Sequence, residues 1–460
     1  MTDFLKDGGS YAVIGLGTSG LSAVNFLAAH GYHVMVVDAA CEPSLASRLP
    51  AGVKTQFGGI EQATLLAVDG IVISPGVNPL HPSVAAARAA GVPIVSDVQL
   101  FVNANRAMND APIVAITGSN AKSTVTTLVG EMAKSAGLTV GVGGNLGTPA
   151  LDLLDVQTQL YVLELSSFQL EAISNLGAAA ATILNLSPDH LDRHGDMQGY
   201  LNAKLRIFAG AKAAVIHAND NALAAACTLQ LANVAGNNIL TVREDTPVAA
   251  SEFGIVQHAD ELWLAKGETL LVKASELLIK GEHNLINALS ALALGMAVGL
   301  PMSSMLQTLK AFRGLSHRCE FVANVDGVDY FNDSKGTNIG ATVAAIHGLG
   351  KVYGTRSLAL IVGGQGKGQQ FGELADCIND YVHTVLTIGE DACQIEADLT
   401  AKNIATPIIA CTTLDKAMQT SQGLTGIKAV LLSPACASFD QFKGYADRGD
   451  SFVRLVQQMA

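Results

Sequence analysis

The sequence predicts three consecutive α/β domains, each built on a mostly parallel sheet. Its length of 460 residues corresponds to about three domains of roughly 150 residues each. Short apolar runs alternate with alanine-rich helical segments along most of the chain, and this βαβ rhythm favours parallel sheets. Hydrophobic residues make up 49% and charged residues 15%, which is enough apolar material for large buried cores.

The first block, of about 100 residues, predicts a Rossmann-like sheet. Strand-like runs occupy 11–17, 33–38, 70–76 and 93–97, and 83–91 is an alanine-rich helical segment. Strands joined by helices in this way wind into a parallel sheet.

The second block begins at Pro112 and predicts a larger α/β domain. Its strand-like runs are 112–119, 139–145, 159–167, 180–186 and 213–220. Residues 251–280 alternate polar and apolar positions instead, which predicts a small antiparallel sheet. A long helix is expected from about Asn284 to Val298.

Leu300-Pro301 and the polar stretch up to Ser316 indicate the next boundary. The last block has strand-like runs at 321–334, 357–364, 383–389, 407–411 and 429–438, which again predict a doubly wound, Rossmann-like domain. We therefore expect domains at 1–99, 100–314 and 315–460.

Composition excludes several classes of protein. A formal net charge of −12 argues against a general nucleic-acid binder. The seven cysteines include no CxxC pair, which favours reduced thiols in a cytoplasmic protein over disulfides or a zinc site. The N-terminus does not resemble a signal peptide, and the longest apolar stretch, 285–300, is too short and too polar for a membrane span.

The motif GLGTSG, Gly15 to Gly20, fits the G-x-G-x-x-G pattern after a strand and before a helix. Such glycines let backbone N–H groups approach a diphosphate. Asp38 ends the next strand, where an acid that binds ribose would lie. The motif indicates a nucleotide diphosphate site. By itself it would predict an NAD enzyme, and a tight turn without a ligand is the alternative.

The motif TGSNAKST, Thr117 to Thr124, follows a strand and opens a helix. Backbone N–H groups, Lys122 and the Ser123 hydroxyl at such a junction suit a triphosphate and Mg²⁺. The strict pattern has glycine where this chain has Ala121. A methyl group there is harmless only if the φ angle of Ala121 is negative and no phosphate oxygen packs against it. The alternative is an ordinary helix start with a solvent-facing lysine.

Charged residues cluster after two further strands. Glu164, in ELSSFQLE, stands at a strand end where an acid can bind Mg²⁺. The segment NLSPDHLDRHG, Asn185 to Gly195, brings together His190, Asp192, Arg193 and His194, and the two histidines are four residues apart. Their spacing is compatible with zinc, but the glutamate of HExxH is missing and Pro188 argues against a regular helix. A solvated loop is the plain alternative.

Position alone indicates little for the remaining candidates. Lys204 would be an ordinary surface lysine on a helix. Asn284 and Asn287 start the long helix and could read a base edge or simply cap the helix. Arg318, Asp333 and Lys335 carry charge near the last predicted boundary, where clefts form between domains; the three residues lie in the motifs SHRCE and NDSKGTN.

The order of these motifs resembles that of the Mur ligase family. The run TGSNAKST, ELSSFQLE, DHLDRH, AKLRIF, HNLIN, HRCE and NDSKGTN covers the middle of the chain, and GLGTSG, SPG and SPACASFDQFKGYADRG extend the resemblance to nearly all of it. The resemblance implies a cytoplasmic, ADP-forming ligase that adds D-glutamate to UDP-N-acetylmuramoyl-L-alanine through an acyl phosphate. It further implies ATP and two Mg²⁺ ions, and we expect a monomer.

The resemblance also assigns roles to residues. Lys122, Glu164, His190 and Lys204 would be catalytic. Metal ligands would be Ser123, Glu164, His190 and a carbamylated Lys204. ATP would be bound by Gly118, Ser119, Asn120, Ala121, Lys122, Ser123, Thr124, Asn284, Asn287, Arg318 and Asp333. The UDP-substrate would be bound by Thr18, Ser19, Asp38, Ser74, Pro75, Gly76, Asn145 and His190. The amino-acid pocket would comprise Lys335, Thr337, Lys367, Ser438, Phe439 and Tyr445.

Two positions depart from the family pattern. Members usually carry glycine at the position of Ala121 and alanine at the position of Gly336. We expect Ala121 to be tolerated because the lysine and hydroxyl groups of the loop are intact.

Three alternative functions remain open at this point. A Mur-type ligase could use another amino acid. An NAD-dependent oxidoreductase is supported only by GLGTSG and Asp38, and it leaves the second phosphate loop unexplained. A nucleotide-gated regulator would bind ATP but would show no substrate-dependent phosphate release.

Overall fold

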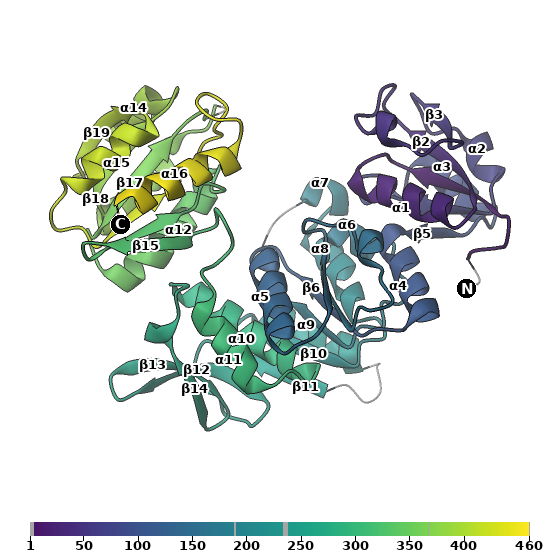
Figure 1. Ribbon diagram of the computed structural model, residues 1–460, viewed down its shortest axis with the longest axis horizontal. Helices are drawn as coiled ribbons and strands as arrows, with labels where there is room; N and C mark the ends of the chain where they lie inside the picture. The colour runs from purple at the N-terminus through teal and green to yellow at the C-terminus, as the bar shows by residue number, and fades with distance from the viewer. Residues whose placement is uncertain (1–3, 188–189, 233–237, 367, 460) are drawn as a thin grey trace. The chain divides into compact units, whose positions relative to one another are not determined.

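The computed structural model describes residues 4–187, 190–232, 238–366 and 368–459. They form two compact units, which are considered separately below. The first comprises Met1–Val272 with Asn287–Leu309, and the second comprises Lys273–Ile286 with Lys310–Ala460. Three separate sheets run through the chain, drawn from purple through teal to yellow in Figure 1.

The first sheet is parallel and has the strand order β3-β2-β1-β4-β5. Its strands are β1 (Ser10–Ile14), β2 (His33–Asp38), β3 (Lys54–Phe57), β4 (Gly70–Ile73) and β5 (Ile94–Ser96). Its helical segments are α1 (Thr18–Ala29), η1 (Ala46–Arg48), α2 (Gln62–Leu66), α3 (Pro82–Ala89) and α4 (Asp97–Met108). The chain order reverses between β1 and β4, and ligands of such sheets bind at the carboxyl ends of the strands beside that reversal.

The second sheet has nine strands in the order β14-β13-β12-β11-β10-β9-β6-β8-β7. They are β6 (Ile113–Thr117), β7 (Val140–Gly144), β8 (Leu160–Glu164), β9 (Ala180–Ile183), β10 (Ala213–His217), β11 (Asn238–Val242), β12 (Glu252–His258), β13 (Glu261–Lys266) and β14 (Thr269–Lys273). The antiparallel pairing of β12 with β13 was predicted, but the prediction that these strands form a sheet of their own was wrong. They are not a separate small sheet, because β12 pairs in parallel with β11 and continues the large sheet.

Helical segments lie between the strands of the second sheet and after the last of them in the chain. They are α5 (Lys122–Ser135), η2 (Ala150–Leu153), α6 (Ser167–Glu171), α7 (Leu191–His194), α8 (Met197–Leu205), η3 (Arg206–Phe208), α9 (Asn221–Ala232), η4 (Ala274–Glu276), α10 (Glu282–Ala297) and α11 (Met302–Ala311). The long helix expected from about residue 284 is α10.

The third sheet has the order β15-β16-β20-β17-β18-β19. Its strands are β15 (Glu320–Val325), β16 (Val328–Asn332), β17 (Leu358–Gly363), β18 (Val382–Ile388), β19 (Ile408–Thr412) and β20 (Ala429–Leu432). Only β15 runs antiparallel to its neighbour. The helical segments are α12 (Ile339–Tyr353), η5 (Phe371–Leu374), α13 (Ala375–Tyr381), α14 (Ala392–Ala401), α15 (Leu414–Gln422) and α16 (Tyr445–Met459).

Buried apolar strands explain these sheets. The residues of β6, β8, β9 and β10 are all buried, as expected for parallel strands covered by helices on both faces. Within the first unit, Phe101 on α4 packs edge-to-face on Tyr161 of β8, with ring centroids 5.0 Å apart. One apolar core therefore links α4 to the second sheet.

The predicted fold class, three α/β domains with mostly parallel sheets, is confirmed. The boundaries at 99/100 and 314/315 stay predictions, and the first of them falls inside α4. Within the described residues, no helix is both long enough and apolar enough to cross a membrane.

Candidate active site

A cavity of about 750 Å³ opens beside the carboxyl ends of β1 and β4 in the first unit. Seven of the eight residues predicted to bind the UDP-substrate line it: Thr18, Ser19, Asp38, Ser74, Pro75, Gly76 and Asn145. The eighth, His190, is not among its lining residues. The cavity is large enough for a nucleotide-sized ligand.

The glycine motif shapes one wall of this cavity. Gly15 has a φ angle of +89°, a conformation that glycine adopts without steric cost. The Ser74 hydroxyl donates to the Gly15 carbonyl at 2.7 Å. The Asp38 carboxylate accepts from the backbone N–H of Leu16 at 2.6 Å and of Ala40 at 2.8 Å. Asp38 therefore holds the glycine loop in shape as well as facing the cavity.

The phosphate loop connects β6 to α5, and its helix begins at Lys122. The first-turn N–H groups of a helix have no intrahelical partners and suit an anion. Ala121, the residue before the helix, has a φ angle of +64°. The condition of a negative φ is therefore not met. The loop keeps the left-handed geometry that glycine favours, and the alanine methyl group makes it strained.

Two lysines converge on the carbonyl groups of this loop. Lys122 Nζ donates to Gly118 O at 3.0 Å and to Ser119 O at 2.9 Å. Lys204 Nζ donates to Gly118 O at 2.9 Å and lies 4.5 Å from the centroid of the Tyr200 ring. Lys204 is only 1% exposed. The reading of Lys204 as a surface lysine is therefore wrong, because α8 packs this side chain against the loop.

Asn185 and Tyr200 support the loop from the side, and sequence reasoning did not single them out. Asn185 accepts from the N–H of Asn120 through its side chain, at 2.8 Å, and from the N–H of Ser119 through its backbone, at 3.1 Å. The hydroxyl groups of Tyr200 and Ser119 lie 3.3 Å apart. A signal was present: Asn185 follows a buried strand, and Tyr200 precedes Lys204 by one helical turn.

Strand register brings Glu164 to the phosphate loop. Glu164 ends β8, opposite Ile116 on β6 and Gly144 on β7. Its carboxylate accepts from Ser123 Oγ at 2.7 Å and from Asn145 Nδ2 at 2.8 Å. Glu164 is 3% exposed. Because Asn145 also lines the cavity, this buried network joins the cavity wall to the first turn of α5.

The segment after β9 is held against α6 by Glu171. The Glu171 carboxylate lies 2.9 Å from Arg193 Nη2 and 3.1 Å from His194 Nδ1. The same Arg193 nitrogen donates to the carbonyl of Val77 at 2.9 Å. Burial lowers the pKa of His194, so its imidazole is mainly neutral at pH 7, and its other nitrogen lies 3.0 Å from the Ser167 hydroxyl. We call Glu171, Arg193 and His194 the Glu171 clamp.

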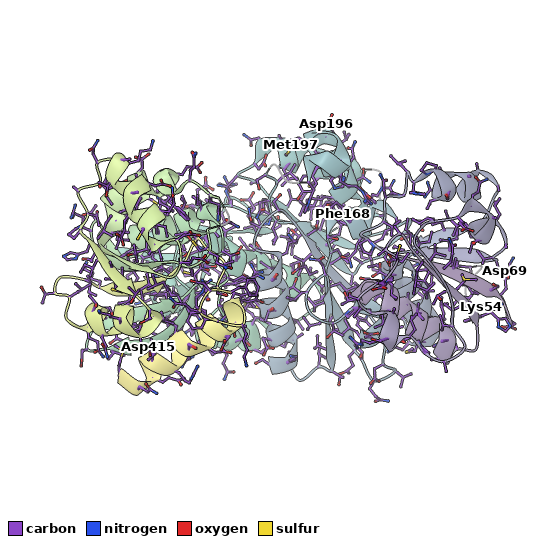
Figure 2. The ribbon with its side chains drawn as sticks, turned by 90° about the horizontal axis from the view of Figure 1, so that it is seen from above. Lys54, Asp69, Phe168, Asp196, Met197 and Asp415 are labelled. Atoms are coloured by element: carbon purple, nitrogen blue, oxygen red, sulfur yellow. The ribbon has the colours of Figure 1, made fainter. Side chains whose placement is uncertain are left out.

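Phe168 of α6, labelled in Figure 2, also packs against the segment that holds His190 and Arg193. Its ring lies 4.7 Å from the ring of the exposed His190 and 5.0 Å from the Arg193 guanidinium. His190 has a φ angle of +52°. Phe168, Glu171 and Arg193 were not predicted as site residues, although all three lie inside the motifs that were singled out.

The other residues predicted to bind ATP lie further along the chain. Asn284 and Asn287 occupy the first two turns of α10, and Asn284 Nδ2 donates to Lys280 O at 2.8 Å. In the second unit, Arg318 is exposed, and Asp333 accepts from Ser433 Oγ at 2.7 Å and from the N–H of Cys319 at 3.1 Å. Burial raises the pKa of Asp333 to about 7.

Residues predicted for the amino-acid pocket belong to the second unit. Lys335 Nζ lies 3.9 Å from the centroid of the Tyr445 ring. Ser438 is buried, whereas Phe439 is 67% exposed. Thr337 is half-buried and follows Lys335 in the same loop. Lys367 lies outside the described residues.

Gly336 allows a close approach in that loop. A Cβ atom there would collide with the Asp333 carboxylate and lie 2.9 Å from Ser433 Oγ. Glycine at this position therefore permits the buried Asp333–Ser433 hydrogen bond as it stands, and alanine would require Asp333 to shift.

Three family models match successive parts of the chain. The "Mur ligase MurD-like, N-terminal domain" matches residues 9–96, the "Mur ligase middle domain" 116–295, and the "Mur ligase, glutamate ligase domain" 317–436.

Relatives match over nearly the full length. A UDP-N-acetylmuramoylalanine–D-glutamate ligase of Psychrobacter arcticus is 52% identical over 99% of this chain and 96% of its own. The protein of the same name from Acinetobacter baylyi is 49% identical over 99% of both chains.

Solved structures support the fold. A UDP-N-acetylmuramoyl-L-alanyl-D-glutamate–2,6-diaminopimelate ligase aligns with a TM-score of 0.61 at 18% identity, over 87% of this chain and 95% of that one. A UDP-N-acetylmuramate–alanine ligase of Thermotoga maritima aligns with a TM-score of 0.57 at 17% identity, over 98% and 100%.

Proposed function

This chain belongs to the Mur ligase family, and from that premise we propose that it joins D-glutamate to UDP-N-acetylmuramoyl-L-alanine with conversion of ATP to ADP and phosphate. Mur ligases use ATP, generally with Mg²⁺. Relatives at 52% and 49% identity are named for this activity. The product is a precursor of peptidoglycan.

The network Ser123–Glu164–Asn145 carries the proposal. Asn145 faces the 750 Å³ cavity and bonds Glu164, and Glu164 bonds Ser123 in the first turn of α5. A substrate bound in that cavity would have its carboxyl end close to a nucleotide bound at the phosphate loop. This proximity is what direct phosphoryl transfer to a carboxylate requires.

The chemistry follows from the poor reactivity of a carboxylate. A substrate carboxylate oxygen attacks the terminal phosphorus of ATP, and the bond from that phosphorus to ADP breaks. The amino group of D-glutamate then attacks the acyl carbon, the C–O bond to phosphate breaks, and phosphate leaves as the amide forms. Lys122 and the N–H groups that begin α5 stabilise negative charge on the transferring phosphoryl group.

The residues present fit a magnesium ion. Mg²⁺ prefers hard oxygen ligands and is often held by one or two carboxylates together with phosphates. The buried Glu164 carboxylate and the Ser123 hydroxyl, 2.7 Å apart, are such oxygens. Within the described residues, no three His, Cys, Asp or Glu side chains form a metal site alone, so substrate oxygens must complete the coordination. The ion would neutralise phosphate charge.

A second ion is proposed at His190 and a carbamylated Lys204. Without carbamylation, the Lys204 ammonium group donates to Gly118 O, and a protonated amine is no metal ligand. Carbamylation would convert it into an anion with oxygen ligands, in the same buried position beside the loop. Metal content measured with and without CO₂ would report that conversion.

The remaining roles follow the family pattern. Asn284, Asn287, Arg318 and Asp333 would contact ATP, and Lys335, Thr337, Lys367, Ser438, Phe439 and Tyr445 would hold D-glutamate. Lysine and hydroxyl groups suit its two carboxylates. We also propose that the enzyme is cytoplasmic, as expected for soluble nucleotide substrates, and that it is a monomer.

A phosphate-release assay tests the proposed function. Purified protein, ATP, Mg²⁺ and UDP-N-acetylmuramoyl-L-alanine are combined with a panel of D- and L-amino acids. We expect release with D-glutamate at least about 100-fold faster than with L-glutamate, because a preorganised pocket discriminates by buried polar contacts. Preference for another amino acid would support a different Mur-type specificity, and release without any UDP-substrate would contradict ligation.

A further inference from the structure

Arg448, in the first turns of α16, uses all five N–H groups inside the second unit. Its Nε donates to Ser334 Oγ at 2.9 Å, and Nη2 donates to Ser334 O at 2.9 Å and Cys436 O at 3.1 Å. Nη1 donates to Ala437 O at 3.3 Å and Gly363 O at 3.4 Å. A guanidinium has five donors in a rigid planar fork, so its hydrogen bonding is complete.

These acceptors belong to three loops that follow adjacent strands. Ser334 follows β16, Cys436 and Ala437 follow β20, and Gly363 ends β17, and the sheet order places β20 between β16 and β17. The three loops thus leave neighbouring carboxyl ends of one parallel sheet. A single side chain from α16 ties all of them together.

The same loops carry the proposed amino-acid pocket. Lys335 directly follows Ser334, Ser438 directly follows Ala437, and the loop after Gly363 leads to Lys367. The backbones of Gln365 and Ala437 exchange two hydrogen bonds of 2.9 Å. The guanidinium therefore contacts the immediate chain neighbours of Lys335 and Ser438.

A relay extends the arrangement to Tyr445. The Ser334 hydroxyl accepts from Arg448 Nε and donates to Tyr445 O at 2.8 Å. Tyr445 in turn presents its ring to Lys335 Nζ at 3.9 Å. The position of this lysine and aromatic pair thus depends on the orientation of the guanidinium.

The acceptors are carbonyl and hydroxyl oxygens rather than a carboxylate. Arg448 is 1% exposed, and burial lowers its pKa to about 10, so it is charged at neutral pH. A buried charge costs desolvation free energy, and replacing such groups by apolar ones often does not reduce stability. Fold stability alone is therefore a weak reason for this residue, and loop geometry is a better one.

We infer that Arg448 is a positioning residue for the amino-acid substrate, fixing the three loops that present cationic and hydroxyl groups to a dicarboxylic amino acid. This inference rests on the proposed function. It assigns Arg448 no contact with substrate. Its effect should be larger on the amino acid, whose proposed pocket draws on the loops after Ser334 and Ala437, than on ATP, to which only Asp333 of these loops is assigned, or on the UDP-substrate.

Arg448→Lys tests the inference. Lysine keeps the positive charge but has one nitrogen, which cannot span three loops. We expect KM for D-glutamate to rise at least about tenfold, with the KM values for ATP and UDP-substrate changing less than about threefold. Arg454→Lys is the matched control on the same helix, where the Arg454 guanidinium donates to Ser451 Oγ at 2.9 Å, and it should leave all three KM values unchanged.

Hydroxylamine separates a local effect from misfolding. It attacks the acyl carbon of the acyl phosphate, a C–N bond forms, the C–O bond to phosphate breaks, and a hydroxamate is released without use of the amino-acid pocket. Arg448→Lys should keep hydroxamate formation within about threefold of the wild-type rate. If Arg448→Lys does not fold, Ser334→Ala serves instead. It removes only the hydroxyl group that joins Arg448 Nε to Tyr445 O, and it should raise KM for D-glutamate about threefold.

The outcomes are distinguishable. An unchanged KM for D-glutamate, or equal losses for all three substrates together with lost hydroxamate formation in folded protein, would overturn the role of Arg448 and leave the proposed function intact. If wild-type protein releases no phosphate in response to D-glutamate, the proposed function fails, and the inference fails with it.

Discussion

At the scale of single residues, Ala121 decides how well the phosphate loop is built. Its φ angle of +64° is costly for any residue with a Cβ atom. The loop nonetheless keeps Lys122, Ser123 and their partners in place. The strain is therefore borne by the backbone and not by a displaced side chain.

Ala121→Gly should relieve that strain. We expect stability to rise by about 0.5–1 kcal/mol, since relief of the left-handed alanine slightly exceeds the entropy cost of the added glycine. This corresponds to a rise of about 1–3 °C in the melting temperature of that part of the chain. Scanning calorimetry would detect it.

Turnover should change less than about threefold in the same variant, because the charged groups of the loop are already placed. A rise in ATP turnover by orders of magnitude would show that the loop is defective with alanine. An unchanged or lower melting temperature would contradict the strained conformation.

The position of a residue in the fold was predictable where its motif is local, but burial that depends on distant segments was not. Lys122 was expected at a helix start and Glu164 at a strand end, and the structure has them there; their roles stay predictions. The burial of Lys204 was not predicted, because its environment comes from the loop after β6, more than eighty positions away in sequence. The i, i+4 pair Tyr200 and Lys204 was the available signal.

At the scale of elements, the Glu171 clamp links α6, α7 and the turn at Val77. Glu171 binds Arg193 and His194, and Arg193 reaches the Val77 carbonyl beside the Ser74–Gly76 wall of the cavity. The clamp therefore sets both the segment that carries His190 and one edge of the proposed UDP-substrate site.

Glu171→Gln should loosen both the segment that carries His190 and the neighbouring edge of the proposed UDP-substrate site. The amide keeps one oxygen acceptor but loses the charge that pairs with Arg193, and charge-assisted bonds are about twice as strong as neutral ones. We expect KM for the UDP-substrate to rise about three- to tenfold and kcat to fall about tenfold, with a smaller change in KM for ATP. Steady-state kinetics with each substrate varied in turn would measure this.

Glu131→Gln is the matched control. Glu131 is exposed on α5 and pairs with Lys134, at 3.0 Å, and such surface pairs contribute little. It should behave as the wild type. If Glu171→Gln also has the same kcat and KM values as the wild type, the clamp has no functional role.

Most strands were predictable from apolar runs, and the exceptions have physical reasons. β3, with the sequence KTQF, is a half-exposed edge strand, so it carries no apolar signature. The run 321–334 was one predicted strand but forms the hairpin β15–β16. Asp326 and Gly327, with φ angles of +50° and +85°, supply the turn that an Asp-Gly pair favours.

At the scale of the whole molecule, the chain forms three sheets, and the proposed function places one ligand site at the carboxyl ends of the strands of each. Alternation of strands and helices was enough to predict this class. The alternation could not show that β12 extends the central sheet, because local periodicity does not determine which strands pair. Nor could it show that Arg448 meets Gly363, 85 positions earlier in the chain.

The groups proposed to transfer the phosphoryl group lie in the first unit, although Asn284, Arg318 and Asp333 of the second unit are proposed to contact ATP. The phosphate loop, Glu164, Asn145 and the cavity all belong to the first unit. An acyl phosphate should therefore form on the substrate carboxylate before the amine reacts.

Oxygen transfer tests this step directly. UDP-N-acetylmuramoyl-L-alanine labelled with ¹⁸O in both carboxylate oxygens is turned over with ATP and D-glutamate, and the released phosphate is analysed by mass spectrometry. An acyl phosphate requires one ¹⁸O atom in each phosphate released, with the other retained in the amide carbonyl. Phosphate that carries no ¹⁸O would contradict phosphoryl transfer to the carboxylate.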